Sequence, residues 1–143
     1  MTRTLKNASA EVVLTIPFHD VDPAQIVWHG HYAKYLEIAR GALLDTFDYN
    51  YLQMSESGYF WPVIDMHLRY VAPIRFQQKI RVRATLREWE NRLLIHYLIT
   101  DHDSGKRLTK GTTSQVAVSM ANNEMLLVSP PIVAERLQNA GLI

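Results

Sequence analysis

Segment 19–32 holds the side chains of this chain that are best suited to chemistry. Two carboxylates, Asp20 and Asp22, and three imidazoles, His19, His29 and His31, stand there with a flexible glycine. A carboxylate that is ionised at neutral pH can accept a proton or attack an electrophilic carbon, and an imidazole can hold or transfer a proton. These residue types indicate acid–base or nucleophilic chemistry without cysteine, which the sequence lacks.

Two other interpretations of this segment stay open on spacing alone. Asp22 followed by Pro23 is typical of a helix N-cap, where the carboxylate accepts a backbone N–H and proline takes the first helical position. His29 and His31, with the two aspartates nearby, have residue types that bind metals, but alternate residues share no face of a helix. We expect neither a metal ion nor a cofactor.

A second charged feature is the basic stretch 75–92, which carries six cations and two carboxylates. Alternation predicts that Lys79, Arg81, Arg83 and Arg87 share one face of a strand. The simplest interpretation is a solvated face, and the alternative is a surface for a phosphate-bearing partner or an acidic carrier protein. A nucleic-acid partner is not expected, because the formal net charge is only +1 and no stacking-aromatic motif accompanies the cations.

The composition is that of an ordinary globular domain, with 48% hydrophobic and 20% charged residues in 143. A chain of this length buries roughly two-thirds of the surface that its unfolded form exposes. Its apolar stretches are far shorter than the ~20 residues that cross a membrane, and no signal-peptide pattern follows the first basic residues. We therefore expect a single cytoplasmic domain over residues 1–143, with no membrane partner.

The elements that position the reactive segment follow from hydrophobic periodicity. Apolar residues recur every three or four positions from His31 to Phe47, which predicts a long amphipathic helix with Lys34, Glu37 and Arg40 on its polar side. A strand at 12–18, at a sheet edge, precedes the reactive segment, and a polar break at 53–58 follows the helix. Further strands are predicted at 64–70, 79–87, 93–100, 108–120 and 125–128, and a terminal helix at 132–140.

Short turns between these strands predict an antiparallel meander. The fold class is therefore α+β, with the long helix packed on a curved antiparallel sheet of about five strands. One helix covers only part of one sheet face, so we expect oligomerisation to bury more of it.

The run 18–32, leading into 34–40, closely resembles the hotdog-fold thioesterases of the 4-hydroxybenzoyl-CoA and acyl-CoA thioesterase type. That family shows an Asp-x-Asp-x-x-x-x-Val-x-His/Tyr loop before its central helix, which Asp20, Asp22, Val27 and His29 match here. The resemblance spans most of the chain and implies a hotdog fold. It also implies hydrolysis of an acyl-CoA or acyl-carrier-protein thioester to a free acid and a thiol.

The resemblance further implies a role for each residue of the loop. Asp22 is expected to be the general base or the nucleophile, and His29 to hold the water or thioester oxygen or else to brace the loop. Backbone N–H groups at His29 and Gly30 are expected to stabilise the oxyanion. The remaining expected contacts are Ile26, Trp28 and Tyr32 along the acyl chain and Arg92 near the phosphates of the thioester donor.

Members of this family are dimers whose sheets join edge to edge, so a homodimer or a dimer of dimers is expected, with Trp61, Val63 or Ile64 of the partner closing the pocket. The chain departs from the family pattern at Gln25, where glycine is usual, and at His31, where asparagine is common. Two other functions remain: a 3-hydroxyacyl thioester dehydratase, and a non-catalytic acyl-thioester binding module.

Overall fold

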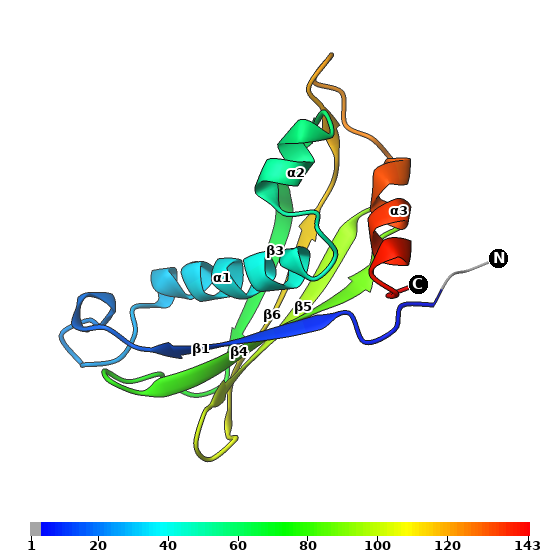
Figure 1. Cartoon of the computed structure of the whole chain (residues 1–143). Helices are drawn as coiled ribbons and strands as arrows, with labels where there is room; N and C mark the ends of the chain where they lie inside the picture. Colours follow the sequence, from blue (N-terminus) through cyan, green and yellow to red (C-terminus); the bar gives the residue numbers. More distant parts are fainter. Residues whose placement is uncertain (1–3) are drawn as a thin grey trace.

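A five-stranded antiparallel sheet and one long helix form the body of the chain (Figure 1). The computed structural model describes residues 4–143. The strands lie in the order β1-β4-β5-β6-β3. Their bounds are β1 (Ser9–Thr15), β3 (Val63–Tyr70), β4 (Lys79–Glu88), β5 (Leu93–Asp101) and β6 (Arg107–Gln115). The predicted architecture of a long helix on an antiparallel sheet of about five strands is confirmed, with β1 at an edge as expected.

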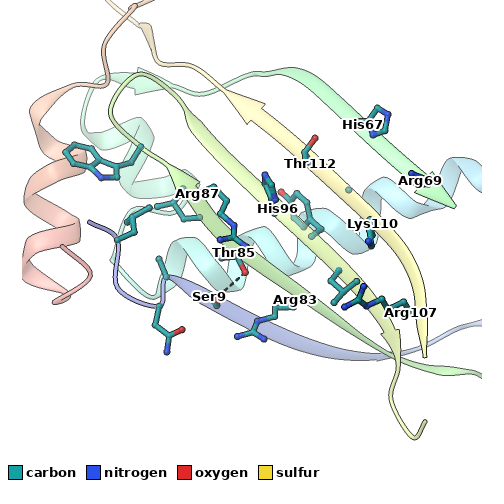
Figure 2. A pocket seen from close by; sticks show the side chains of 18 of the residues that line it. Ser9, His67, Arg69, Arg83, Thr85, Arg87, His96, Arg107, Lys110 and Thr112 are labelled. Carbon is teal, nitrogen blue, oxygen red and sulfur yellow. Dashed lines mark hydrogen bonds between the residues drawn. The ribbon is translucent and has the colours of Figure 1, made fainter. Parts of the chain in front are cut away.

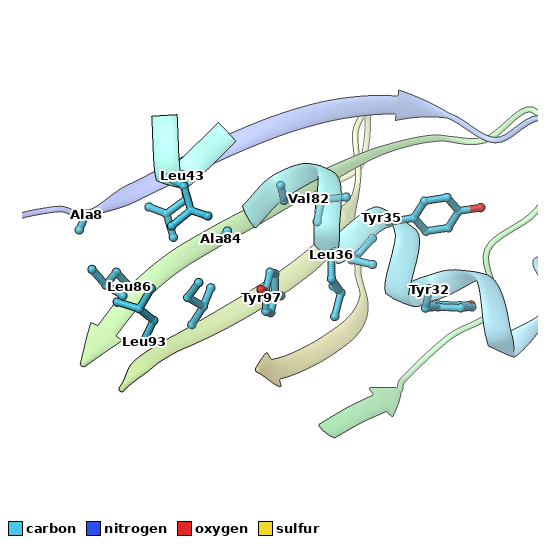
Figure 3. Packing of buried hydrophobic residues seen from close by; sticks show 14 of the residues in the cluster. Ala8, Tyr32, Tyr35, Leu36, Leu43, Val82, Ala84, Leu86, Leu93 and Tyr97 are labelled. Carbon is cyan, nitrogen blue, oxygen red and sulfur yellow. The ribbon is translucent and has the colours of Figure 1, made fainter. Parts of the chain in front are cut away.

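Helix α1 (Tyr32–Asp45) covers the inner face of the sheet. It begins one residue later than predicted, because His29–His31 form a single 3-10 turn, η2. Its apolar stripe is almost fully buried, as expected for a helix whose 3.6-residue period faces a core. Figure 3 shows this packing between α1, β4 and β5, with the labelled side chains Tyr35, Leu36, Leu43, Val82, Ala84, Leu86, Leu93 and Tyr97.

Arg40 does not lie on the exposed side of α1, as the periodicity predicts, but is only 6% exposed. Its Nε donates to Tyr51 Oη at 3.1 Å, and its Nη1 donates to Tyr97 Oη at 3.4 Å. Tyr97 Oη lies 2.7 Å from Thr113 Oγ1, so a chain of polar groups runs through the core. A buried guanidinium needs such partners, and the chain supplies them from Tyr51 and from Tyr97 of β5, which sequence spacing does not reveal.

The predicted simple meander is wrong at one strand. β3 pairs with β6 at the far edge of the sheet and not with β4, the next strand in sequence. The connection 71–78 crosses the end of the sheet. At its start, Val71 N and Ala72 N both donate to Leu108 O. At its end, Ile16 N donates to Gln78 O and Gln77 N donates to Ile16 O. Eight residues suffice for a hairpin or for this crossing, so length alone did not distinguish the two.

Two smaller predictions also fail. The polar break at 53–58 is mostly helix α2 (Tyr51–Glu56), which begins in a capping box between Asn50 and Gln53. No strand forms at 125–128, where the described chain has only an isolated bridge between Met125 and Val118.

The segment predicted as one strand at 108–120 divides into β6 and β7 (Val118–Ser119), and β7 pairs with β2 (Tyr59–Phe60). The terminal helix is confirmed as α3 (Pro131–Asn139). No helix within residues 4–143 combines the length and the apolar character that a membrane span requires.

Candidate active site

Asp22 stands at the head of a tight turn. Val21 and Val27 form an antiparallel bridge, Asp22 N donates to Ile26 O at 2.9 Å, and Gln25 N donates to Asp22 O at 2.8 Å. The Asp22 side chain accepts a hydrogen bond from Ala24 N through Oδ1 at 2.9 Å. It therefore caps a hairpin turn and not a helix. Its second oxygen, Oδ2, accepts no hydrogen bond from residues 4–143.

Gln25 has a left-handed backbone, with φ of +65°. Glycine adopts this conformation without a steric penalty, which explains why a turn of this shape favours glycine. Gln25 is exposed and does not line the nearby cavity. Its departure from the family pattern therefore affects the backbone of the turn and not the chemistry beside it.

A cavity of about 300 Å³ lies between this turn, the start of α1 and the end of β3. It contains four of the residues that the sequence singled out, Asp22, Ile26, His29 and Tyr32. The other side of the cavity comes from the far edge of the sheet, through Tyr70, Val71, Ala72 and Pro73. The volume lies at the lower end of the range for small-molecule sites.

Gly30 and Trp28 do not line this cavity but pack against each other beside it. A Cβ on Gly30 would stand 2.2 Å from the Trp28 ring, so the indole occupies the space that a side chain at residue 30 needs. Trp28 is 47% exposed and also contacts His31 edge-on, with ring centroids 5.2 Å apart.

Arg92 lies in the turn between β4 and β5. Its Nε donates to Glu88 Oε2 at 3.0 Å and its Nη1 donates to Ser114 Oγ at 3.1 Å. The structure does not bring Arg92 to the cavity that holds Asp22.

Two backbone amides at the entry to α1 are free to bind an anion. Trp28 N donates to Asp20 O and His31 N donates to Trp28 O, whereas in residues 4–143 neither His29 N nor Gly30 N donates to a protein acceptor. Unpaired N–H groups at a helix start, with the positive end of the helix dipole behind them, stabilise negative charge. His29 itself lines the cavity.

Tyr70 is a site residue that sequence reasoning missed. Its Oη donates to His29 O at 2.8 Å, and its ring packs edge-on against Tyr32 with centroids 4.7 Å apart. The sequence pattern indicates only that Tyr70 is the last apolar residue of the alternating strand predicted at 64–70. Its role arises because the β3 edge lies beside the entry to α1.

Asp20 is buried, and it anchors the loop to α1. Its Oδ1 accepts from Lys34 Nζ at 2.7 Å and its Oδ2 accepts from Tyr35 Oη at 2.6 Å. Burial raises the pKa of Asp20, but the hydrogen bonds from Lys34 and Tyr35 lower it by more. The pKa of Asp20 therefore lies below its ordinary value. Burial and the contact with Asp20 raise the pKa of Tyr35. Asp20 is therefore an ionised structural anchor.

The structure does not support a metal site at Asp20, Asp22, His29 and His31. Asp20 is occupied by Lys34 and Tyr35. Across the described residues 4–143, no three His, Asp or Glu side chains lie close enough together to hold a metal ion.

Comparison with known proteins adds independent observations. The family model described as thioesterase-like superfamily matches residues 16–137. A Synechocystis protein provisionally named an esterase, sll0410, is 26% identical over 134 residues, which cover 89% of this chain and 77% of that protein. A Bacillus subtilis protein provisionally named an acyl-CoA thioesterase, YneP, is 22% identical over 105 residues, which cover 73% of this chain and 76% of that protein.

Among solved structures, a DHNA-CoA thioesterase from Staphylococcus aureus superposes with a TM-score of 0.80 at 22% identity. The match covers 94% of this chain and 96% of the other. This likeness concerns the fold.

Proposed function

Since the chain belongs to the thioesterase-like superfamily, we propose that it hydrolyses acyl thioesters with the Asp22 carboxylate as general base or nucleophile. The resemblance and the hotdog fold predicted from the sequence are confirmed, and family membership supports thioester hydrolysis as the general chemistry. The observation that carries the finer proposal is one cavity that joins Asp22, with an unoccupied carboxylate oxygen, to His29, with an unoccupied amide N–H.

The proposed reaction uses only groups of this chain and water. As a base, Asp22 takes a proton from water while the water oxygen attacks the thioester carbonyl carbon. As a nucleophile, it attacks that carbon directly and forms an anhydride, which water then hydrolyses. In both routes the N–H groups of His29 and Gly30 stabilise the oxyanion, the C–S bond breaks, and the thiolate leaves and gains a proton.

The donor and the acyl group are proposed at the level of class. Acyl-CoA and acyl-carrier-protein thioesters both present the same scissile bond to Asp22. Ile26 and Tyr32 line the cavity and would contact the acyl part, with Trp28 at its margin. The contact of Arg92 with donor phosphates stays a prediction, as does the cytoplasmic location.

We propose that two copies of the chain pair along β3. This strand has a free edge and exposes Val63, Ile64 and Met66 by 43%, 53% and 47%. An apolar strand edge of this kind favours pairing with a second strand. Trp61, in contrast, is 6% exposed and donates from Nε1 to Tyr49 Oη at 3.1 Å, so it is committed to its own core. Light scattering on the purified chain measures the mass of the assembly.

The direct test is release of free thiol from a panel of CoA and carrier-protein thioesters, short to long and aromatic. A thioesterase frees the thiol, whereas a dehydratase converts a 3-hydroxyacyl thioester to an enoyl thioester and frees none. A binding module binds several thioesters and converts none. Failure of every thioester to yield thiol, from folded protein, contradicts the proposal.

Tyr70→Phe is expected to lower kcat/KM by about fivefold with little change in melting temperature. The variant keeps the ring that packs on Tyr32 but loses the hydrogen bond to His29 O, which holds the turn that presents the two amides. A hydrogen bond of this kind contributes about 1 kcal/mol. Steady-state kinetics measures the loss, and Tyr59→Phe, a tyrosine outside the cavity, is the matched control.

Gly30→Ala is expected to reduce kcat/KM by about tenfold, because the added methyl group must displace the Trp28 ring from the turn that holds the oxyanion donors. Gly41→Ala is the control, since a Cβ there meets nothing closer than 3.9 Å and α1 gains helix propensity. Kinetics and melting curves of both variants separate the two effects. Equal activity of the Gly30 variant and the wild type would show that this turn takes no part in catalysis.

A further inference from the structure

The outer face of the sheet, away from α1, carries a broad hollow of about 1010 Å³. Figure 2 shows the labelled side chains that line it on one face of β1, β3, β4, β5 and β6. The hollow shares no lining residue with the cavity that holds Asp22. It is therefore a separate feature that the proposed hydrolysis does not use.

A row of polar side chains without carboxylates, arginines or lysines crosses the floor of this hollow. The strand registers place its members opposite one another in turn, from β1 to β3, as Ser9, Thr85, His96, Thr112 and His67. Adjacent strands are about 4.8 Å apart, so the row forms a continuous line of hydroxyl and imidazole groups. Ser9 Oγ and Thr85 Oγ1 are hydrogen-bonded at 2.9 Å.

Cations flank this row on both sides. On one side the register places Arg83, Leu98, Lys110 and Arg69 in line, and on the other side stands Arg87. Like charges directly opposite on neighbouring strands, as for Lys110 and Arg69, destabilise a sheet. A chain that keeps them there retains a positive surface at a cost in stability.

These charges are not neutralised by the protein. In the described part of the chain, four cations that line the hollow have no carboxylate within ion-pair distance, namely Arg69, Arg87, Arg107 and Lys110. Arg83 lies 3.9 Å from Glu11, and Glu90 is the one carboxylate among the lining residues described. Burial, and then the charge of Arg87, lower the pKa of His96, so its imidazole is neutral at pH 7.

We propose that this hollow binds a small ligand with two or more adjacent phosphate groups, of the class of nucleoside diphosphates. Arginine presents a planar fork that matches phosphate oxygens, and the row of hydroxyl and imidazole groups supplies further hydrogen-bond donors between the cations. The hollow is as large as the larger small-molecule sites.

The test is calorimetric titration of the full chain at low ionic strength with ADP, inorganic pyrophosphate and adenosine. ADP and pyrophosphate are expected to bind, more weakly as salt is added, and adenosine is not. Tighter binding of ADP identifies a nucleotide as the ligand, and equal binding identifies the bare diphosphate; both support the site.

Arg87→Gln combined with Lys110→Gln is expected to weaken binding by about tenfold or more, since each lost charge-assisted contact is of that order. Arg75→Gln combined with Lys106→Gln removes two exposed charges elsewhere and is expected to leave binding unchanged. Thioester hydrolysis is expected to be the same in both double variants, so the outcome does not depend on the proposed function. The site is disproved by absence of binding of both phosphate compounds, or by equal losses of binding in the two double variants.

Discussion

Asp22→Asn is expected to reduce kcat/KM for thioester hydrolysis by about 10²–10⁴-fold, the range that acid–base or nucleophilic groups contribute. The amide is neither a base nor a nucleophile at neutral pH. It still presents an oxygen to Ala24 N, the one hydrogen bond that the Asp22 side chain makes with residues 4–143. The turn is therefore expected to persist, and the melting temperature to change little.

Asp103→Asn is the matched control, because Asp103 is an exposed carboxylate in the turn between β5 and β6. Thiol release is measured for both variants and for the wild type under saturating and limiting substrate. A loss confined to the Asp22 variant supports a direct role for this carboxylate. A folded Asp22 variant with wild-type activity would rule the assignment out.

The sequence predicts those helices and strands whose buried residues recur at one regular spacing. α1 and β4 lie where the pattern of apolar residues places them, since each buries one continuous face. The position of β3 is not predictable in the same way. It depends on the path of 71–78, which is fixed by backbone hydrogen bonds to Leu108 and Ile16 from distant parts of the chain.

The site shows the same division. Asp22, Ile26, His29 and Tyr32 come from one continuous motif, and the structure brings all four to one cavity. Tyr70 comes from an edge strand that periodicity predicts but whose neighbour it does not identify. Its contact with His29 therefore has no signal in the sequence.

Asp20 stands in the same motif as Asp22, yet its surroundings give it a different role. One side chain accepts two short hydrogen bonds from α1 in a buried setting, and the other keeps an oxygen free beside a cavity. Both residues are aspartates of one motif, so the sequence does not distinguish them. Only their hydrogen-bond partners distinguish Asp20, the anchor, from Asp22, the proposed catalytic group.

Asp20→Asn is expected to lower the free energy of unfolding by about 2–4 kcal/mol at pH 7, because Lys34 and Tyr35 lose a buried ionised acceptor. Glu37→Gln, which removes an exposed carboxylate from α1, is the control and is expected to change little. Urea unfolding of the variants measures both. The Asp20 side chain ties the loop that carries Asp22 to Lys34 and Tyr35 of α1, so the Asp20 variant is expected to lose activity as well.

The dependence of stability on acid pH tests whether the charge of Asp20 is what stabilises the fold. The pKa of Asp20 is lower in the folded chain than its ordinary value, so the unfolded chain takes up the proton first as the pH falls. The stabilisation is fully present above the ordinary aspartate value of about 3.9 and is lost as the pH falls through the lower, folded value. The wild type is therefore expected to lose its advantage over Asp20→Asn only below about pH 4. An advantage that persists unchanged into that acid range would show that Asp20 stabilises the loop through its shape and not its charge.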